Sequence, residues 1–299
     1  MILLSFFFVL LWLLLYTLCG GIWLAIGVHL VSAALLAVFA GFGLHPLRAS
    51  RFADWFMGHW MRTNFDDASR AVLAALDPSK QHVVLCEPHG QVPLAMCRFA
   101  GYGTEVPRAF ARRTVVMGSS FMLLLPFFCQ FFQLCGMVFA ARVAVDATLD
   151  RSLNVVACLS GLKGKSASIV RDARECRRVD AHGRHVIDVV RPERCGLLVL
   201  AARRGLTIVP VFSPMEERAF WNVPVLFGER GCNTHVVLTM GNEWFMRPFC
   251  DVRVRVGAPI DTKALRLDPN SPRDMHELTE LVYASMKQLA EPDCVVKLE

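Results

Sequence analysis

The first 47 residues contain no Asp, Glu, Lys or Arg, and this stretch constrains the fold more than any other feature of the chain. Two histidines, His29 and His45, are its only residues of the basic or acidic types. A bilayer core of roughly 30 Å needs about 20 apolar residues per helix, and the stretch holds two such lengths on either side of a glycine pair. We therefore expect an N-terminal transmembrane helical hairpin with arms at about 2–19 and 21–41.

A secretory signal peptide is the main alternative for this stretch. Such a signal has a basic first region and a small-residue cleavage site after a short apolar run, whereas this N-terminus has no basic residue and stays apolar well past a signal's length. The first charges after the hairpin are Arg48 and Arg51, with Arg62 further on. Because basic residues favour the cytoplasmic side of a membrane segment, we expect the rest of the chain to face the cytosol.

Residues 48–299 alternate between short β-rich runs and helical patterns. The β-rich runs lie at 82–86, 114–117, 168–170, 206–212, 235–240 and 252–256. The helical patterns lie at 51–63, 66–76, 195–204 and 275–290. This alternation is typical of an α/β fold, in which helices flank a mixed sheet. No repeat or low-complexity linker interrupts it, so we expect one domain, 48–299, behind one anchor, 1–47.

The distribution of charge and of cysteine excludes several classes of function. The net charge of +6 is scattered, and no groove-reading motif accompanies it, which indicates a solvated surface or proximity to anionic lipid rather than nucleic-acid binding. The 11 cysteines are dispersed without metal-ligand spacing, as is usual for reduced cytosolic thiols. His182 and His185 have no further ligands at suitable spacing, so we expect a polar loop and no metal there.

A histidine at a sharp turn, in the tetrapeptide Glu87-Pro88-His89-Gly90, follows the β-rich run 82–86. Pro88 fixes its own φ and restricts Glu87 to extended geometry, while Gly90 permits a turn or a close backbone approach. Such a turn would fix the direction of the His89 imidazole. An imidazole held in this way can act as a general base near neutral pH. A structural histidine in a tight turn is the alternative.

Four blocks in the same order resemble the diacylglycerol and monoacylglycerol acyltransferases of the second type. They are Leu76-Asp77-Pro78-Ser79, the tetrapeptide at 87–90, Arg194-Cys195-Gly196-Leu197 with Val209-Pro210-Val211-Phe212, and the segment 254–260 before a terminal helix. The resemblance covers nearly all of 48–297 and also fits the hairpin. It implies a membrane enzyme of the endoplasmic reticulum or lipid droplet that transfers a fatty acyl group from acyl-coenzyme A to diacylglycerol, forming triacylglycerol.

The resemblance also implies catalytic roles. His89 becomes the candidate general base, and Glu87 can share a face with it because alternate residues of an extended segment do so. A solvent-exposed carboxylate is the alternative for Glu87. Related glycerol-phosphate acyltransferases carry an aspartate five positions after the histidine, but this chain has Leu94 there. Glu175 aligns with the glutamate of the family's GGxxE block and is the candidate that orients His89, although both glycines of that block are replaced.

Substrate contacts are expected at Pro88 and Gly90 and at two arginines. Arg171 and Arg194 are candidates to bind the phosphates of coenzyme A, and Arg194 the developing oxyanion; an exposed helix-end arginine is the alternative for Arg194. The resemblance implies no cofactor, since acyl-coenzyme A is the donor substrate, and it leaves a homo-oligomer open.

Departures from the family pattern keep alternatives open for the acceptor. Residues 213–217 read SPMEE, where the family has a different sequence, so monoacylglycerol and long-chain (wax) alcohols remain alternative acceptors. The altered block at 171–175 also leaves open an inactive, membrane-anchored relative that binds lipid. An α/β-hydrolase is excluded because the chain has no GxSxG nucleophile elbow.

A second apolar region lies at 121–140 and is rich in phenylalanine. Pro126 interrupts it, and Gln130 and Gln133 lie inside it, so a core or interfacial helix is favoured over a full membrane span. The region could form one wall of an acyl-chain tunnel, with ordinary core packing as the alternative.

Overall fold

A computed structural model gives the architecture of the chain. It describes residues 22–41, 50–55, 59, 62–88, 93–99, 105–118, 128–159, 179–189, 196–214, 216, 219–226, 236–240, 251–291 and 294–298. The first expected arm of the hairpin, 2–19, and the expected strand 168–170 lie outside these ranges.

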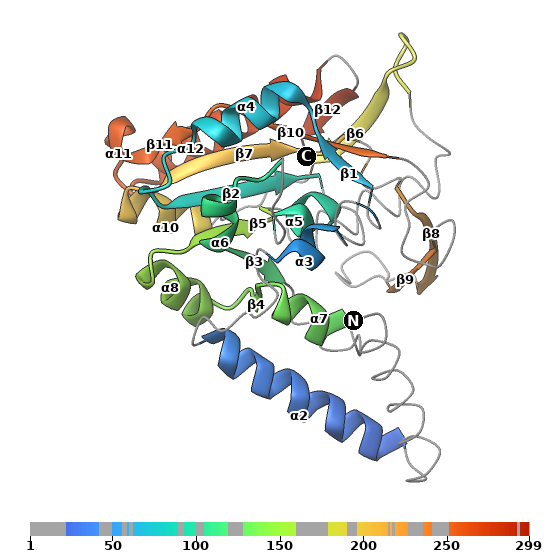
Figure 1. Cartoon of the computed structure of the whole chain (residues 1–299). Helices are drawn as coiled ribbons and strands as arrows, with labels where there is room; N and C mark the ends of the chain where they lie inside the picture. The colour runs from blue at the N-terminus through green and yellow to red at the C-terminus, as the bar shows by residue number, and fades with distance from the viewer. Residues whose placement is uncertain are drawn as a thin grey trace.

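A mixed sheet forms the centre of the molecule, with helices on both of its faces (Figure 1). Its strand order is β1-β10-β7-β2-β5-β3-β4, with β11 also paired to β7. These strands are β1 (Thr63–Phe65), β2 (His82–Glu87), β3 (Thr114–Gly118), β4 (Met137–Phe139), β5 (Asn154–Ala157), β7 (Thr207–Phe212), β10 (Val252–Val256) and β11 (Ile260–Asp261). The run β7-β2-β5-β3-β4 is parallel, and β10 and β11 are antiparallel to β7. The α/β class and the strands expected at 82–86, 114–117, 206–212 and 252–256 are confirmed.

The described residues also contain two smaller sheets, each of two strands. β6 (His185–Val189) pairs in parallel with β12 (Cys294–Leu298), and β8 (Trp221–Leu226) pairs antiparallel with β9 (Val236–Met240). β9 confirms the strand expected at 235–240.

β2 is buried along its whole length because it lies in the middle of the sheet and both of its faces are covered. Its residues alternate between two hydrophobic clusters, as the period of a strand requires. Val84 packs with α4 (Asp67–Ala75), α5 (Leu94–Arg98) and α6 (Arg108–Arg112). Val83 and Leu85 pack with α8 (Arg142–Asp150), α10 (Gly196–Arg204) and α12 (Pro272–Ala290). The strand that precedes His89 is therefore rigidly held.

The helical patterns at 66–76, 195–204 and 275–290 are confirmed by α4, α10 and α12. The prediction of one helix over 51–63 was wrong. The helix α3 covers Arg51–Trp55, and Thr63 begins β1, which pairs in parallel with β10. Pairing with a distant strand decides the conformation there, and the local spacing of apolar residues does not report it.

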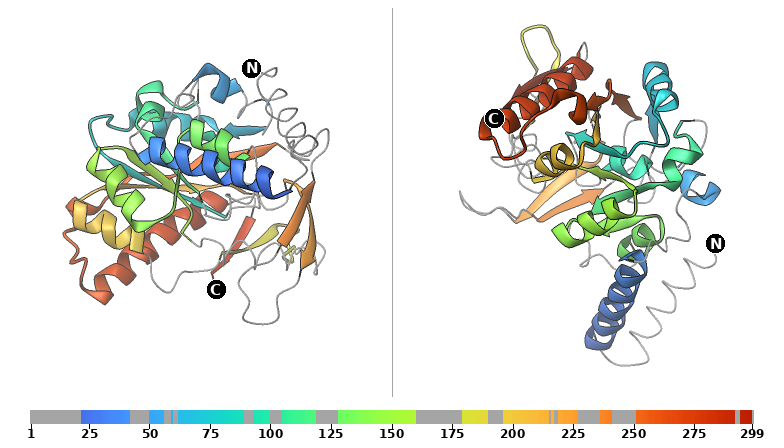
Figure 2. Two further views of the ribbon diagram at one scale, coloured as in Figure 1. Left: turned by 90° about the horizontal axis from the view of Figure 1, so that it is seen from below. Right: turned by 90° about the vertical axis from the view of Figure 1, so that its left-hand side faces the viewer.

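The second apolar region is not one helix: within its described part it forms α7 (Phe128–Leu134) and then β4. α7 lies beside α2 (Ile22–Gly41), as Figures 1 and 2 show. The Gln130 side chain donates to Ser32 Oγ at 2.9 Å and lies 2.7 Å from His29 Nδ1. Gln133 donates to the Ala33 carbonyl at 3.2 Å. The two glutamines thus join α7 to α2, which explains their place in an apolar segment.

α2 leaves much of its apolar surface exposed. The exposed side chains are those of Ile26, Val28, Leu30, Val31, Leu35 and Val38. Among the described residues, no helix combines the length and the apolar character needed to cross a membrane. The transmembrane hairpin therefore stays a prediction.

Candidate functional site

The candidate site lies where β2 and β7 end, at the edge of the sheet that is formed by the carboxyl ends of its parallel strands. The two strands are parallel neighbours, and Glu87 at the end of β2 is in register with Phe212 at the end of β7. In open α/β sheets, ligands bind outside the carboxyl ends of the strands. The tetrapeptide therefore begins where the fold offers a binding edge.

The structure describes only part of the set of residues predicted from the sequence. Glu87 and Pro88 are both buried, with Glu87 only 1% exposed, which excludes the exposed-carboxylate alternative for Glu87. The other predicted residues lie outside the described ranges: His89, Gly90, Arg171, Glu175 and Arg194.

Glu216 is a buried acid at this edge that the sequence analysis did not single out. It follows β7 in the segment noted only as a departure from the family pattern, and its side chain is 1% exposed. Glu216 Oε2 accepts a hydrogen bond from the Ala95 backbone N–H at 3.0 Å, across 121 positions of sequence. The signal that could have found it is an acid four positions after a β-rich run, near the strand end where ligands bind.

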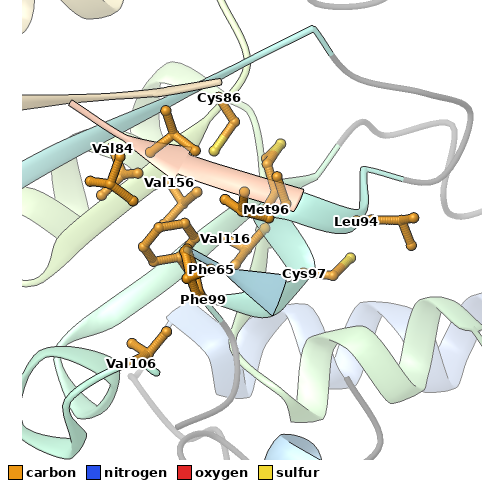
Figure 3. Packing of buried hydrophobic residues seen from close by; sticks show 14 of the residues in the cluster. Phe65, Val84, Cys86, Leu94, Met96, Cys97, Phe99, Val106, Val116 and Val156 are labelled. Carbon is orange, nitrogen blue, oxygen red and sulfur yellow. The ribbon is translucent and has the colours of Figure 1, made fainter. Parts of the chain in front are cut away.

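The cysteines near this edge are buried thiols. Figure 3 shows Cys86 of β2 in one packed cluster with Met96 and Cys97 of α5. Burial raises the pKa of Cys86 well above its usual range, and the negative charges of Glu216 and Glu87 raise it further. Burial and then Glu216 act on the pKa of Cys97 in the same direction. Because the thiolate is the nucleophilic form, neither thiol is activated for attack at neutral pH.

Ionic contacts hold the far end of α5. Arg98, which ends this helix, donates through Nε to Glu105 Oε2 at 2.9 Å and through Nη1 to Asp54 Oδ1 of α3 at 3.0 Å. Burial raises the pKa of Asp54, and the charge of Arg98 opposes that rise. The helix that follows the tetrapeptide is thus tied to α3, the first helix after the expected anchor.

No metal centre is formed by the residues that the structure describes, since they contain no group of three His, Cys, Asp or Glu side chains suited to a metal ion. The backbone N–H of His182 donates to Asp180 Oδ1 in an exposed turn, in agreement with the polar loop expected there. His185 differs from that prediction, because it is the first residue of β6.

Comparison with known proteins identifies the family of the chain. The sequence matches the profile described as diacylglycerol acyltransferase over residues 21–241. No curated protein sequence matched. Among solved structures, the 1-acyl-sn-glycerophosphate (LPA) acyltransferase PlsC from Thermotoga maritima aligns over 96% of this chain and 93% of that one, with 12% identity and a TM-score of 0.44.

Proposed function

Because the chain belongs to the diacylglycerol acyltransferase family and is therefore an acyltransferase, we propose that it transfers a fatty acyl group from acyl-coenzyme A to diacylglycerol, forming triacylglycerol. The observation that carries the proposal is the position at which the tetrapeptide begins: the carboxyl end of the buried strand β2, beside the end of β7, which is followed by the buried acid Glu216.

In the proposed mechanism His89 acts as the general base. It accepts the hydroxyl proton of the acceptor alcohol while the alcohol oxygen attacks the thioester carbonyl carbon. The carbon–sulfur bond then breaks, and the departing sulfur takes the proton from the imidazolium, which releases coenzyme A as a thiol. General-base assistance of this kind contributes about 10²–10⁴-fold in rate.

Acyl transfer is direct in this proposal and does not pass through an acyl-cysteine. The support is the raised pKa of Cys86 and Cys97, which keeps these two thiols in their protonated form. A protonated thiol is a poor nucleophile, so the alcohol itself must attack the thioester.

The remaining roles come from the family resemblance and are part of the proposal. Glu87 supports His89 electrostatically from two positions away, and its burial favours such a role because charges interact more strongly away from water. Glu175 orients His89. Arg171 and Arg194 bind the phosphates of coenzyme A, and Arg194 also stabilises the oxyanion.

The N-terminal hairpin anchors the enzyme to the endoplasmic reticulum or to lipid droplets in this proposal, with residues 48–299 in the cytosol. The charge-free sequence of 1–47 and the exposed apolar side chains of α2 support it. The full chain should then stay in the membrane pellet after washing in alkaline carbonate. Release into the supernatant would contradict the anchor.

The function is tested by expression in cells that lack neutral-lipid synthesis, followed by assay with labelled oleoyl-coenzyme A. The acceptors are diacylglycerol, monoacylglycerol and a long-chain alcohol. We expect triacylglycerol from the wild type, a loss of about 10²–10⁴-fold in His89→Ala, and normal activity in His182→Ala, which alters an exposed turn. If a wax ester is the only product, the acceptor is a long-chain alcohol and not diacylglycerol. If the folded protein makes no ester with any acceptor, the enzymatic proposal is refuted.

A further inference from the structure

Two hydrogen bonds from the segment after β7 hold both ends of the loop that carries His89. At the start of the loop, the Ser213 backbone N–H donates to the Glu87 carbonyl at 3.0 Å. At its end, Glu216 Oε2 accepts from the Ala95 N–H at 3.0 Å. Ser213, the donor of the first bond, and Glu216, the acceptor of the second, lie three positions apart in one short turn.

That turn is itself well fixed. Ser213 is fully buried, and the Glu216 N–H donates to its carbonyl at 3.3 Å. The Glu216 carbonyl accepts from the Ala219 N–H at 3.1 Å. The Ser213 hydroxyl reaches the Arg253 carbonyl of β10 at 3.4 Å. The Glu216 carboxylate therefore projects from a buried turn anchored to two strands.

The hydrogen bond to Glu216 also satisfies a backbone N–H in the first turn of α5. The first N–H groups of a helix have no partner within it and are usually satisfied by the side chain at the N-cap. The N-cap of α5 is Pro93, whose side chain makes no such bond. Ala95 is buried, so its N–H would be costly to leave unsatisfied. Glu216 supplies from a distant part of the chain the contact that a local cap would make.

From these contacts we infer that Glu216 is a positioning residue for catalysis: its hydrogen bond to the Ala95 N–H fixes the end of the loop that carries His89 relative to β7. The inference rests on the proposed function, since it assigns the purpose of that rigidity to the general base. Small errors in the position of a catalytic group can reduce the rate on the order of 100-fold. Glu216 acts through the loop and need not touch either substrate.

Two conservative substitutions separate this role from one that depends on charge. Glu216→Gln keeps an oxygen at the same reach but removes the charge, so it should retain most of the wild-type kcat. Glu216→Asp keeps the charge but shortens the side chain by one methylene, so it should lose the bond and lower kcat on the order of 10-fold to 100-fold. The KM for acyl-coenzyme A should stay close to wild type in both. A role based on charge predicts the reverse ranking of the two variants.

Asn154→Ala provides a matched control at the other end of β2. Asn154 is equally buried, and its Oδ1 accepts from the His82 N–H at 2.9 Å. The variant removes the same kind of side-chain bond to backbone and should lower stability while leaving kcat per folded molecule unchanged. If Asn154→Ala lowers kcat as much as Glu216→Asp does, Glu216 has only a structural role.

Hydrogen exchange of the peptide covering 88–98 gives a readout independent of activity. We expect faster exchange at Ala95 in Glu216→Asp than in the wild type and Glu216→Gln, and no change there in Asn154→Ala. Equal exchange in all four proteins would overturn the inference even if the enzyme is active. If the wild type makes no ester, the proposed function fails, and the exchange pattern still decides whether Glu216 holds the loop.

Discussion

Glu105 accepts two hydrogen bonds from the Arg98 guanidinium through one carboxylate oxygen, and both side chains are buried. Arg98 ends α5, and Asp54 of α3 binds a further nitrogen of the same guanidinium. α5 is thus held at its first turn by Glu216 and at its last residue by Arg98. The short helix after His89 is braced at both ends by polar contacts to distant parts of the chain.

Glu105→Ala should destabilise the protein strongly, because it leaves the buried Arg98 without its principal partner. Removing one member of a buried ion pair typically costs about 3–5 kcal/mol in the free energy of unfolding. Asp67→Ala is the control, since it removes an exposed partner of Arg70 and should have little effect. Denaturant titration of both variants measures the difference, and similar midpoints would show that burial of the pair is unimportant.

Gly257→Ala should destabilise the contact between β7 and α12. An added Cβ would lie 2.9 Å from Ser285 Oγ and 3.0 Å from Pro210 Cγ, and such overpacking costs about 1–3 kcal/mol. Gly196→Ala offers the comparison, because a Cβ at this first residue of α10 meets open space. We expect Gly196→Ala to be neutral or to stabilise by up to about 1 kcal/mol. Thermal melts showing equal shifts would refute the packing argument.

The stability of the fold should decrease below neutral pH, partly because of His82. Burial lowers the pKa of His82, and the positive charge of Arg113 acts in the same direction. The folded state therefore binds the proton less well than the unfolded state, whose histidine titrates near pH 6.5. Stability from neutral His82 is complete above about pH 6.5 and is lost as pH falls toward the lowered pKa of the folded state.

Replacing His82 tests this pH dependence directly. His82→Gln should flatten the fall in unfolding free energy on the acid side of about pH 6.5. His276→Gln, at an exposed position of α12, should leave the slope as in the wild type. An unchanged slope in His82→Gln would show that other groups account for the acid sensitivity.

The thiols at the site edge should resist alkylation in the folded enzyme. Their raised pKa leaves Cys86 and Cys97 protonated near neutral pH, and maleimides react with the thiolate. Mass spectrometry after a maleimide pulse should find both cysteines unmodified until the protein is unfolded. Cys97→Ala should retain catalytic activity per folded molecule, and its inactivation would favour an acyl-cysteine route.

The proposed base implies an acid limb in the pH dependence of kcat/KM. His89 must be neutral to accept a proton, so activity should fall as pH decreases through the imidazole pKa, ordinarily near 6.5. The measurement should be made on enzyme shown to remain folded at each pH, since stability also declines in acid. A profile that is flat to about pH 5 would exclude a histidine base with an ordinary pKa.

Much of the secondary structure and the class of the fold could be predicted from the sequence, because both depend on local patterns. The run at 82–86 identifies β2 by its short length and β-branched apolar composition, and the amphipathic pattern at 275–290 identifies α12 by the period of its apolar residues. The prediction of one helix over 51–63 fails because part of this segment depends on a distant strand and not on a local pattern. Thr63 enters a strand by pairing with Val252, and no local signal reports a partner so far along the chain.

The candidate site divides in the same way. The sequence determined that the tetrapeptide with His89 follows a β-rich run, since Pro88, Gly90 and the run before them are local features. Only the tertiary structure decided which distant residues contact the described segments on either side of it. Parallel pairing of β2 with β7 brings two strand ends to one edge, and this pairing places Glu216 against the N–H of Ala95 across 121 positions. Strand order is set by packing of the whole domain. The contact of Glu216 with Ala95 could therefore be identified only from the tertiary structure.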